Sequence, residues 1–172
     1  YYNQKRLDGA MKEFMNAISL NPDYAEAHNN LGLVYYNKGR VDDAIKEYLT
    51  ALELNPNFAM AHNNLGLVYY NKGRVDDAIK EYLTALGLNP NYAPAHSNLG
   101  LAYYNKGWVD DAIKEYTTAL KLKSDYLETH YNLGLAYQKK GLNEEAIKEF
   151  KNALEIRPDF REAHNAIQSL AR

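Results

Sequence analysis

The chain has 172 residues, 24% of them charged, and a formal net charge of −2, a balance that argues against a surface built to coat nucleic acid or anionic lipid. It contains no cysteine, which excludes disulfides, thiol catalysis and thiolate metal sites. No apolar run approaches the roughly 18 residues needed to cross a bilayer, and the N-terminal sequence is unlike a signal peptide, so we expect a cytoplasmic protein.

A period of 34 residues organises the sequence. The pair Leu-Gly recurs at this step, and so does every histidine of the chain: His28, His62, His96, His130 and His164. The segments 25–58 and 59–92 differ at only three positions. Such a period is typical of a stacked supersecondary unit that cannot bury its apolar face alone.

In chain order, we expect residues 1–24 to form part of a repeat, mainly its second helix. Four complete repeats follow at 25–58, 59–92, 93–126 and 127–160, and residues 161–172 supply one further first helix.

Each complete repeat carries the boundaries of two helices. In the segment 25–58 a helix-compatible run ends at Asn37-Lys38-Gly39, because glycine just past a helix end adopts the left-handed conformation without a Cβ penalty. Asp42 then lies where an N-cap carboxylate can accept backbone N–H groups. A second run, from Ala44 to Leu54, ends at Asn55-Pro56, since proline disfavours helix at the residue before it.

This pattern resembles the tetratricopeptide repeat (TPR) family, which forms helix–turn–helix units of about 34 residues. Small residues recur where the family packs its helices, at Gly32, Gly66, Gly100 and Gly134 and at Ala44, Ala78, Ala112 and Ala146. Bulky residues follow at Tyr48, Tyr82, Tyr116 and Phe150, then proline at Pro56, Pro90 and Pro158. The resemblance implies an all-α fold, a right-handed α-solenoid (TPR superhelix) whose first helices (A) line a concave groove and whose second helices (B) form the convex back.

Helix A carries two different faces, because residues three and four apart share a face. His28, Leu31, Gly32 and Tyr35 form a packing face. The other face is almost uncharged and contains asparagine, leucine and tyrosine, although asparagine is a mediocre helix former. An amide has both a donor and an acceptor for a peptide backbone, and tyrosine suits recognition surfaces.

We therefore predict a peptide-binding groove on this second face. Its residues are Asn29, Asn30, Leu33, Tyr36, Asn37, Asn63, Asn64, Leu67, Tyr70, Asn71, Asn98, Leu101, Tyr104, Asn105, Tyr131, Asn132 and Lys139. Among them, Asn30, Asn64, Asn98 and Asn132 resemble the asparagine ladder of the superhelix attached to O-linked N-acetylglucosamine transferase, which holds extended peptides. The alternative is that these asparagines are solvated residues copied by duplication.

Specificity is expected towards repeat 127–160, where the face changes to Tyr131, Asn132, Leu135, Gln138 and Lys139. Other tetratricopeptide domains capture a chaperone's C-terminal carboxylate with lysine, arginine and asparagine on this face. That function is disfavoured here because Leu33, Leu67 and Leu101 occupy one of those positions and the early positions of the face carry no lysine or arginine in the three central repeats.

Chemistry other than binding has little support. The histidines lie on the packing face without a ligand at the spacing of H-x-x-x-H, so we expect structural, hydrogen-bonded side chains and not a metal ladder. The pair Asp42-Asp43 and its copies begin helix B, where acidic side chains favour the helix dipole. Tyrosines could stack bases, but no basic track accompanies them.

We expect a non-enzymatic protein–protein interaction module with no cofactor and no metal. Its ligand would be a protein or peptide, with no nucleic acid and no membrane insertion. The alternative is a self-associating scaffold, a head-to-tail assembly of solenoids, without a dedicated peptide ligand. Residues 161–172 and 1–24 nearly compose one repeat when placed end to end, overlapping at Tyr1 and Tyr2, and Met11, Phe14, Ile18, Ile167 and Leu170 would then need cover.

Overall fold

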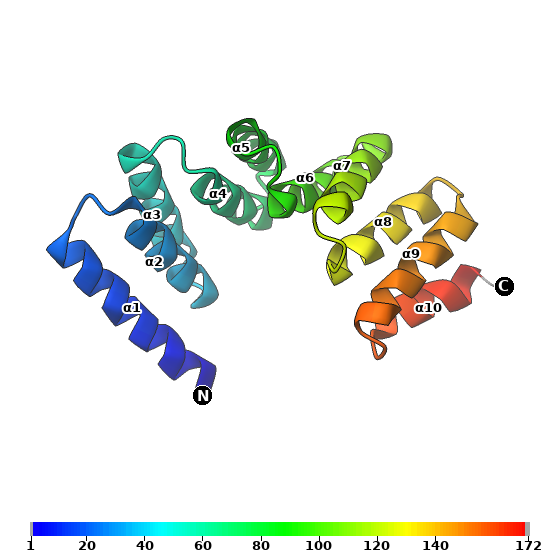
Figure 1. Ribbon diagram of the computed structural model, residues 1–172, viewed down its shortest axis with the longest axis horizontal. Coiled ribbons are helices and arrows are strands. Elements are labelled where there is room, and N and C mark those ends of the chain that lie inside the picture. The colour runs from blue at the N-terminus through cyan, green and yellow to red at the C-terminus, as the bar shows by residue number, and fades with distance from the viewer. Residues whose placement is uncertain (1, 171–172) are drawn as a thin grey trace. The chain divides into compact units, whose positions relative to one another are not determined.

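The computed structural model describes the backbone of residues 2–170 and the side chains of residues 5–170; of the expected overlap, Tyr1 lies outside the described residues. These residues form ten α-helices and no strand (Figure 1), so the expected all-α fold is confirmed. The helices are α1 (Tyr2–Leu20), α2 (Ala25–Asn37), α3 (Val41–Leu54), α4 (Ala59–Asn71), α5 (Val75–Leu88), α6 (Ala93–Asn105), α7 (Val109–Leu122), α8 (Leu127–Lys139), α9 (Asn143–Ile156) and α10 (Arg161–Leu170).

The chain forms two compact units, Tyr1–Pro90 and Asn91–Arg172. In the first unit α2 pairs with α3 and α4 with α5, while α1 packs on α2 and α3 on α4. In the second unit α6 pairs with α7 and α8 with α9, while α7 packs on α8 and α9 on α10. Each unit is therefore a stack of consecutive antiparallel A and B helices, as in a tetratricopeptide solenoid (Figure 1).

Glycine follows the A helices α2, α4, α6 and α8, as the sequence predicts. Gly39 has φ 74 and Gly107 has φ 81, a left-handed conformation that costs glycine little. The amide of Gly39 donates to the carbonyl of Tyr36 at 2.9 Å, which satisfies one of the carbonyls left open at the helix end.

The start of helix B differs from the expectation. Helix α3 begins at Val41, so Asp42 is not its N-cap; Arg40 occupies that position and makes no side-chain cap hydrogen bond. Asp42 instead accepts from Lys72 Nζ at 2.8 Å. Asp42 and Asp43 still lie in the first turn of α3, where negative charge favours the helix dipole.

A glycine–aromatic contact holds each A helix against its B helix. A Cβ added to Gly32 would lie 2.7 Å from Cε1 of Tyr48, closer than two carbon atoms can approach. Tyr48 is 1% exposed, and burying a large side chain of this kind contributes about 1.5–3 kcal/mol. The glycine of the recurring Leu-Gly pair is therefore the position where an aromatic ring packs directly on the backbone of the A helix.

The residues expected to need cover at the chain ends are partly buried within their own units. Met11, Phe14 and Ile18 of α1 pack against the core cluster that contains Tyr48 and Leu65. Ile167 and Leu170 of α10 pack against the cluster of Ala146, Phe150 and Ala163. These five side chains keep part of their surface exposed, and head-to-tail association stays a prediction.

Candidate functional site

The candidate site is the side of helices α2, α4, α6 and α8 that faces away from their B helices, which we call the A-face. The helical period places its residues together and leaves the packing face to the core. On the packing face Leu31 and Tyr35 are 3% and 9% exposed. On the A-face Leu33 is 42% exposed, while Asn30, Tyr36 and Asn64 are half-buried and Asn37 and Asn71 are exposed.

Two predicted site residues lie between neighbouring helices instead of facing outwards. Asn29 and Asn63 are 1% and 5% exposed, so the expectation that their side chains contact a ligand is wrong. The Oδ1 atom of Asn29 accepts from Nδ2 of Asn64 on the next A helix at 3.0 Å, and its Nδ2 donates to Asn30 Oδ1 at 3.3 Å. The physical reason is that α2 packs beside α4, and a buried amide needs hydrogen-bond partners.

A second lateral link joins α2 and α4 near their C-terminal ends. Asn71 donates through Nδ2 to the hydroxyl of Tyr36. The first unit therefore uses asparagine at two positions of the A-face to couple neighbouring repeats, with hydrogen bonds that typically contribute about 0.5–1.5 kcal/mol each.

In the second unit both links change chemistry. Ser97, at the position of Asn29, shares a hydroxyl–hydroxyl hydrogen bond of 2.7 Å with Thr129, which stands at the position of Ala27 and not at that of Asn64. Lys139 Nζ lies 4.9 Å from the centroid of the Tyr104 ring, a cation–π contact in place of the asparagine–tyrosine bond. The half-buried amide of Asn132 makes no hydrogen bond to any residue that the structure describes. The change of groove-face residues that the sequence shows in repeat 127–160 thus coincides with different contacts between α6 and α8.

Tyr131 differs from its counterparts because an aromatic cluster holds its ring. The ring centroid lies 5.5 Å from that of Phe150 and 5.1 Å from that of Phe160, the second pair edge to face. Such geometry is favourable for aromatic rings. Tyr131 is therefore half-buried and packs towards α9.

A cavity of about 240 Å³ lies at the N-terminal ends of α6 and α8. Its lining residues are Pro94, Ser97, Asn98, Tyr126, Glu128 and Thr129. Of these residues only Asn98 is among the predicted groove residues, although Pro94 and Ser97 lie on the same face of the helix. The signal that could have found the cavity is the departure from asparagine and alanine at positions 97 and 129.

The histidines form structural links within each repeat, as predicted. His28 Nδ1 lies 2.7 Å from Glu47 Oε2, and the corresponding distances are 2.6 Å for His62–Glu81, His96–Glu115 and His130–Glu149. Sequence reasoning missed the glutamates, which lie 19 residues later on helix B. The constant spacing of histidine and glutamate was the available signal.

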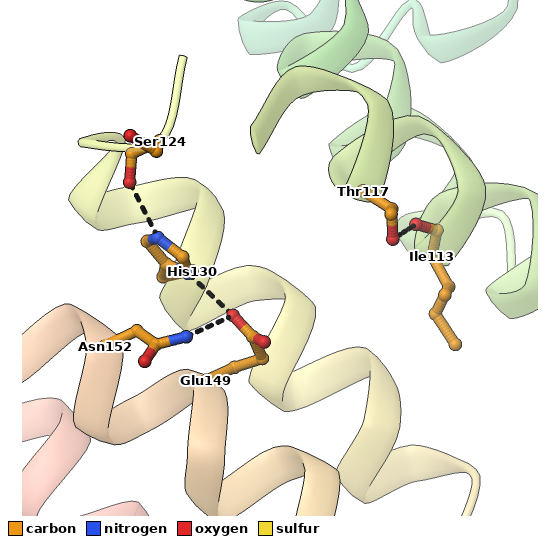
Figure 2. Close-up of polar contacts among 6 residues, drawn as sticks. All are labelled: Ile113, Thr117, Ser124, His130, Glu149 and Asn152. Carbon is orange, nitrogen blue, oxygen red and sulfur yellow. Dashed lines mark hydrogen bonds and ion pairs between the residues drawn. The ribbon is translucent and has the colours of Figure 1, made fainter. Parts of the chain in front are cut away.

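The surroundings of His130 favour its charged form (Figure 2). Its Nδ1 lies against Glu149 Oε2 at 2.6 Å, and its Nε2 donates to the carbonyl of Ser124 at 2.9 Å. Burial lowers the pKa of His130, but the hydrogen bonds to Glu149 and Ser124 outweigh this effect and the pKa is raised. Since both partners are acceptors, the ring donates from both nitrogens only when it is protonated.

Two other functional classes gain no support from the described part of the chain. Within it, no group of three or more histidine, aspartate and glutamate side chains is arranged to hold a metal ion. None of the helices over residues 2–170 has the length and apolar content that a membrane crossing requires.

Family models match nearly the whole sequence. A TPR repeat model matches residues 1–39, 34–73, 68–107 and 106–141. A tetratricopeptide repeat model matches residues 127–160. No match was found among curated protein sequences.

Solved structures show the same architecture. The chain is similar to MamA, with 32% identity over 91% of this chain and 92% of that chain and a TM-score of 0.75. It is also similar to a thermophilic TPR protein of Thermus thermophilus, with 27% identity over 99% and 93% of the two chains and a TM-score of 0.77. YrrB, described as a TPR protein with an unusual peptide-binding site, matches over 97% and 86% of the two chains at 24% identity and a TM-score of 0.74.

Proposed function

Because the chain belongs to the tetratricopeptide repeat family, whose members generally mediate protein–protein interaction, we propose that its A-face binds an extended peptide segment of a partner protein. The proposal assigns no catalytic step to the chain. It applies to the A-face of each compact unit taken by itself.

The observation that carries the proposal is the hydrogen bonding of Asn64. One N–H of its Nδ2 donates to Asn29 at 3.0 Å, and its Oδ1 accepts from Asn63 at 3.4 Å. A carboxamide has two N–H donors and two acceptor lone pairs, so one donor and one lone pair remain for a ligand. The buried neighbours therefore orient a half-buried amide that can pair with both the C=O and the N–H of a peptide backbone.

The residues beside this amide favour the same kind of ligand. Leu33 is 42% exposed on α2, and Tyr36 and Tyr70 are half-buried on α2 and α4. Apolar and aromatic surface next to fixed polar groups is typical of binding sites. A face without lysine or arginine at these positions favours recognition of backbone and apolar side chains over recognition of a carboxylate.

Replacement of the ladder residues tests the proposal. Peptides that bind the wild-type chain are first selected from a display library and their affinities measured by calorimetry. The Asn30→Ala/Asn64→Ala variant, with both changes in the first unit, should keep its helical circular dichroism and bind the selected peptides more than about tenfold less tightly, since two lost hydrogen bonds of about 1 kcal/mol each correspond to this change.

Lys46→Ala supplies the matched control, because Lys46 is exposed on helix α3, away from the A-face. It should leave the affinity unchanged. Equal affinities for the wild-type chain and the double variant would remove the asparagines from the binding mechanism.

A further inference from the structure

The turns between A and B helices in the first unit each hold an arginine between two partners. The guanidinium of Arg40 lies 4.2 Å from the centroid of the Tyr35 ring, and its Nε lies 2.7 Å from Asp43 Oδ2. Arg74 repeats both contacts, 4.2 Å from the Tyr69 ring and 2.6 Å from Asp77. An aromatic ring and a carboxylate three residues after the arginine thus form a cradle for a guanidinium.

In the second unit a tryptophan takes the place of the arginine in this cradle. Trp108 stands where Arg40 and Arg74 stand in the neighbouring repeats, and it is the single tryptophan of the chain. Its ring packs on Tyr103 at a centroid distance of 5.5 Å and remains 47% exposed. Asp111, the counterpart of Asp43, is exposed and has no ion pair with the described residues.

The next repeat of this unit shows the same replacement. Leu142 takes the arginine position and is 37% exposed, and Glu145 takes the position of the paired aspartate, again without an ion pair in the described chain. An ion pair between Lys140 and Asp110 joins the two turns. The second unit therefore presents exposed apolar groups beside unpaired carboxylates at both of its A–B turns.

We propose that Trp108 and Asp111 form a docking site for an arginine side chain of a partner protein. Tryptophan is the best aromatic acceptor of a cation, and the planar guanidinium can stack on the indole while it donates to the carboxylate. In the first unit the aspartate at this position pairs with a guanidinium that stacks on a tyrosine ring, Tyr35 or Tyr69. In the second unit Trp108 takes the place of that guanidinium on the Tyr103 ring, so the charge of Asp111 is left for a guanidinium from a partner, stacked on the exposed indole.

The neighbouring charges are compatible with an arginine. Lys140 is neutralised by Asp110. Lys106 Nζ lies 5.6 Å from the centroid of the Trp108 ring, near the outer limit of about 6 Å for a cation–π contact. The combination of an exposed tryptophan with an arginine is also enriched at the centres of protein interfaces.

The site lies at the α6–α7 turn and is independent of peptide binding on the A-face. The experiment uses a peptide library in which one arginine is fixed within randomised flanks. Peptides are selected on the wild-type chain and counter-selected on Trp108→Arg, which supplies the internal arginine of the neighbouring repeats and should melt at the wild-type temperature or higher.

Calorimetry with the surviving peptides then measures the contribution of the charge. Replacing the peptide arginine with citrulline, its neutral isostere, should weaken binding about three- to thirtyfold, and Asp111→Asn should weaken binding of the arginine peptide but not of the citrulline peptide. Arg74→Trp should create a second copy of the site and raise the stoichiometry from one peptide to two.

Three results would each overturn the proposal. In the first, no peptide survives the counter-selection. In the second, citrulline peptides bind as tightly as arginine peptides. In the third, the arginine peptide keeps its affinity for Asp111→Asn. If the asparagine variants lose peptide binding on the A-face but still bind the arginine peptides, the Trp108–Asp111 site is independent of the A-face.

Discussion

The pairing of His130 with Glu149 makes stability depend on pH. Removing the negative charge with Glu149→Gln keeps the shape of the side chain and an acceptor for Asn152, whose Nδ2 lies 3.2 Å from Glu149. The His130 and Glu149 side chains are only 11% and 14% exposed. Solvent therefore screens their interaction less than it screens a surface pair, and a hydrogen bond between charged groups contributes about 1.5–3 kcal/mol.

The direction of the effect follows from the raised pKa of His130. A histidine whose pKa is higher in the folded chain stabilises the fold fully at pH values below its unfolded pKa, near 6.5. That contribution disappears as the pH rises through the folded pKa, because the proton leaves in both states. The substitution should therefore cost most stability under mildly acidic conditions and little at alkaline pH.

Thermal unfolding followed by circular dichroism at pH 5.5 and pH 9 measures the difference. For a chain of this size about 1 kcal/mol corresponds to about 2–4 °C, so Glu149→Gln should lower the melting temperature by about 3–12 °C at the acidic pH and much less at the alkaline pH. Lys148→Gln, an exposed neighbour on α9, is the control. An equal decrease at both pH values would refute the assignment of a protonated His130.

Two further predictions concern the glycine–aromatic contacts. Gly66→Ala should lower the free energy of unfolding by about 1–3 kcal/mol in a denaturant titration, since its Cβ would lie 2.7 Å from Cε1 of Tyr82 and a packed core accommodates extra atoms poorly; wild-type stability would mean that the ring moves freely. Tyr82→Phe should change the melting temperature little because Phe150 fills the equivalent site in another repeat, whereas Tyr82→Ala should cost about 3–5 kcal/mol; equal losses in both variants would assign the contribution to the hydroxyl.

Sequence alone predicted the features that depend on a single helix or turn. The left-handed glycine after α2 and the proline that follows α3 act within a few residues, so their effect can be read from local chemistry. The B helix begins at Val41 and not at Ala44, because both first-turn aspartates are compatible with helix and no residue before them stops it.

Prediction of the site residues required information that the sequence of a single repeat does not contain. The exposed face of an isolated helix includes Asn29, and only the packing of α4 beside α2 shows that this side chain is buried. The His28–Glu47 pair likewise joins residues on different helices. Contacts of this kind depend on how helices pack, which the periodicity of one helix does not determine.

The asparagine link also bears on how such an array grows. Asn29 is the fifth residue of its repeat, and Asn64 is the sixth residue of the next repeat. A repeat with asparagine at both positions can therefore bond the following repeat through its fifth residue and the preceding repeat through its sixth. Tandem duplication of such a segment produces a matched junction at once, without a compensating substitution, and the segments 25–58 and 59–92 retain asparagine at both positions. Where the fifth position diverges, at Ser97, its hydroxyl bonds Thr129 at the third position of the following copy, although asparagine is kept at the sixth position, Asn132. Copies on the two sides of such a change are no longer interchangeable, so divergence fixes the order of the repeats along the chain.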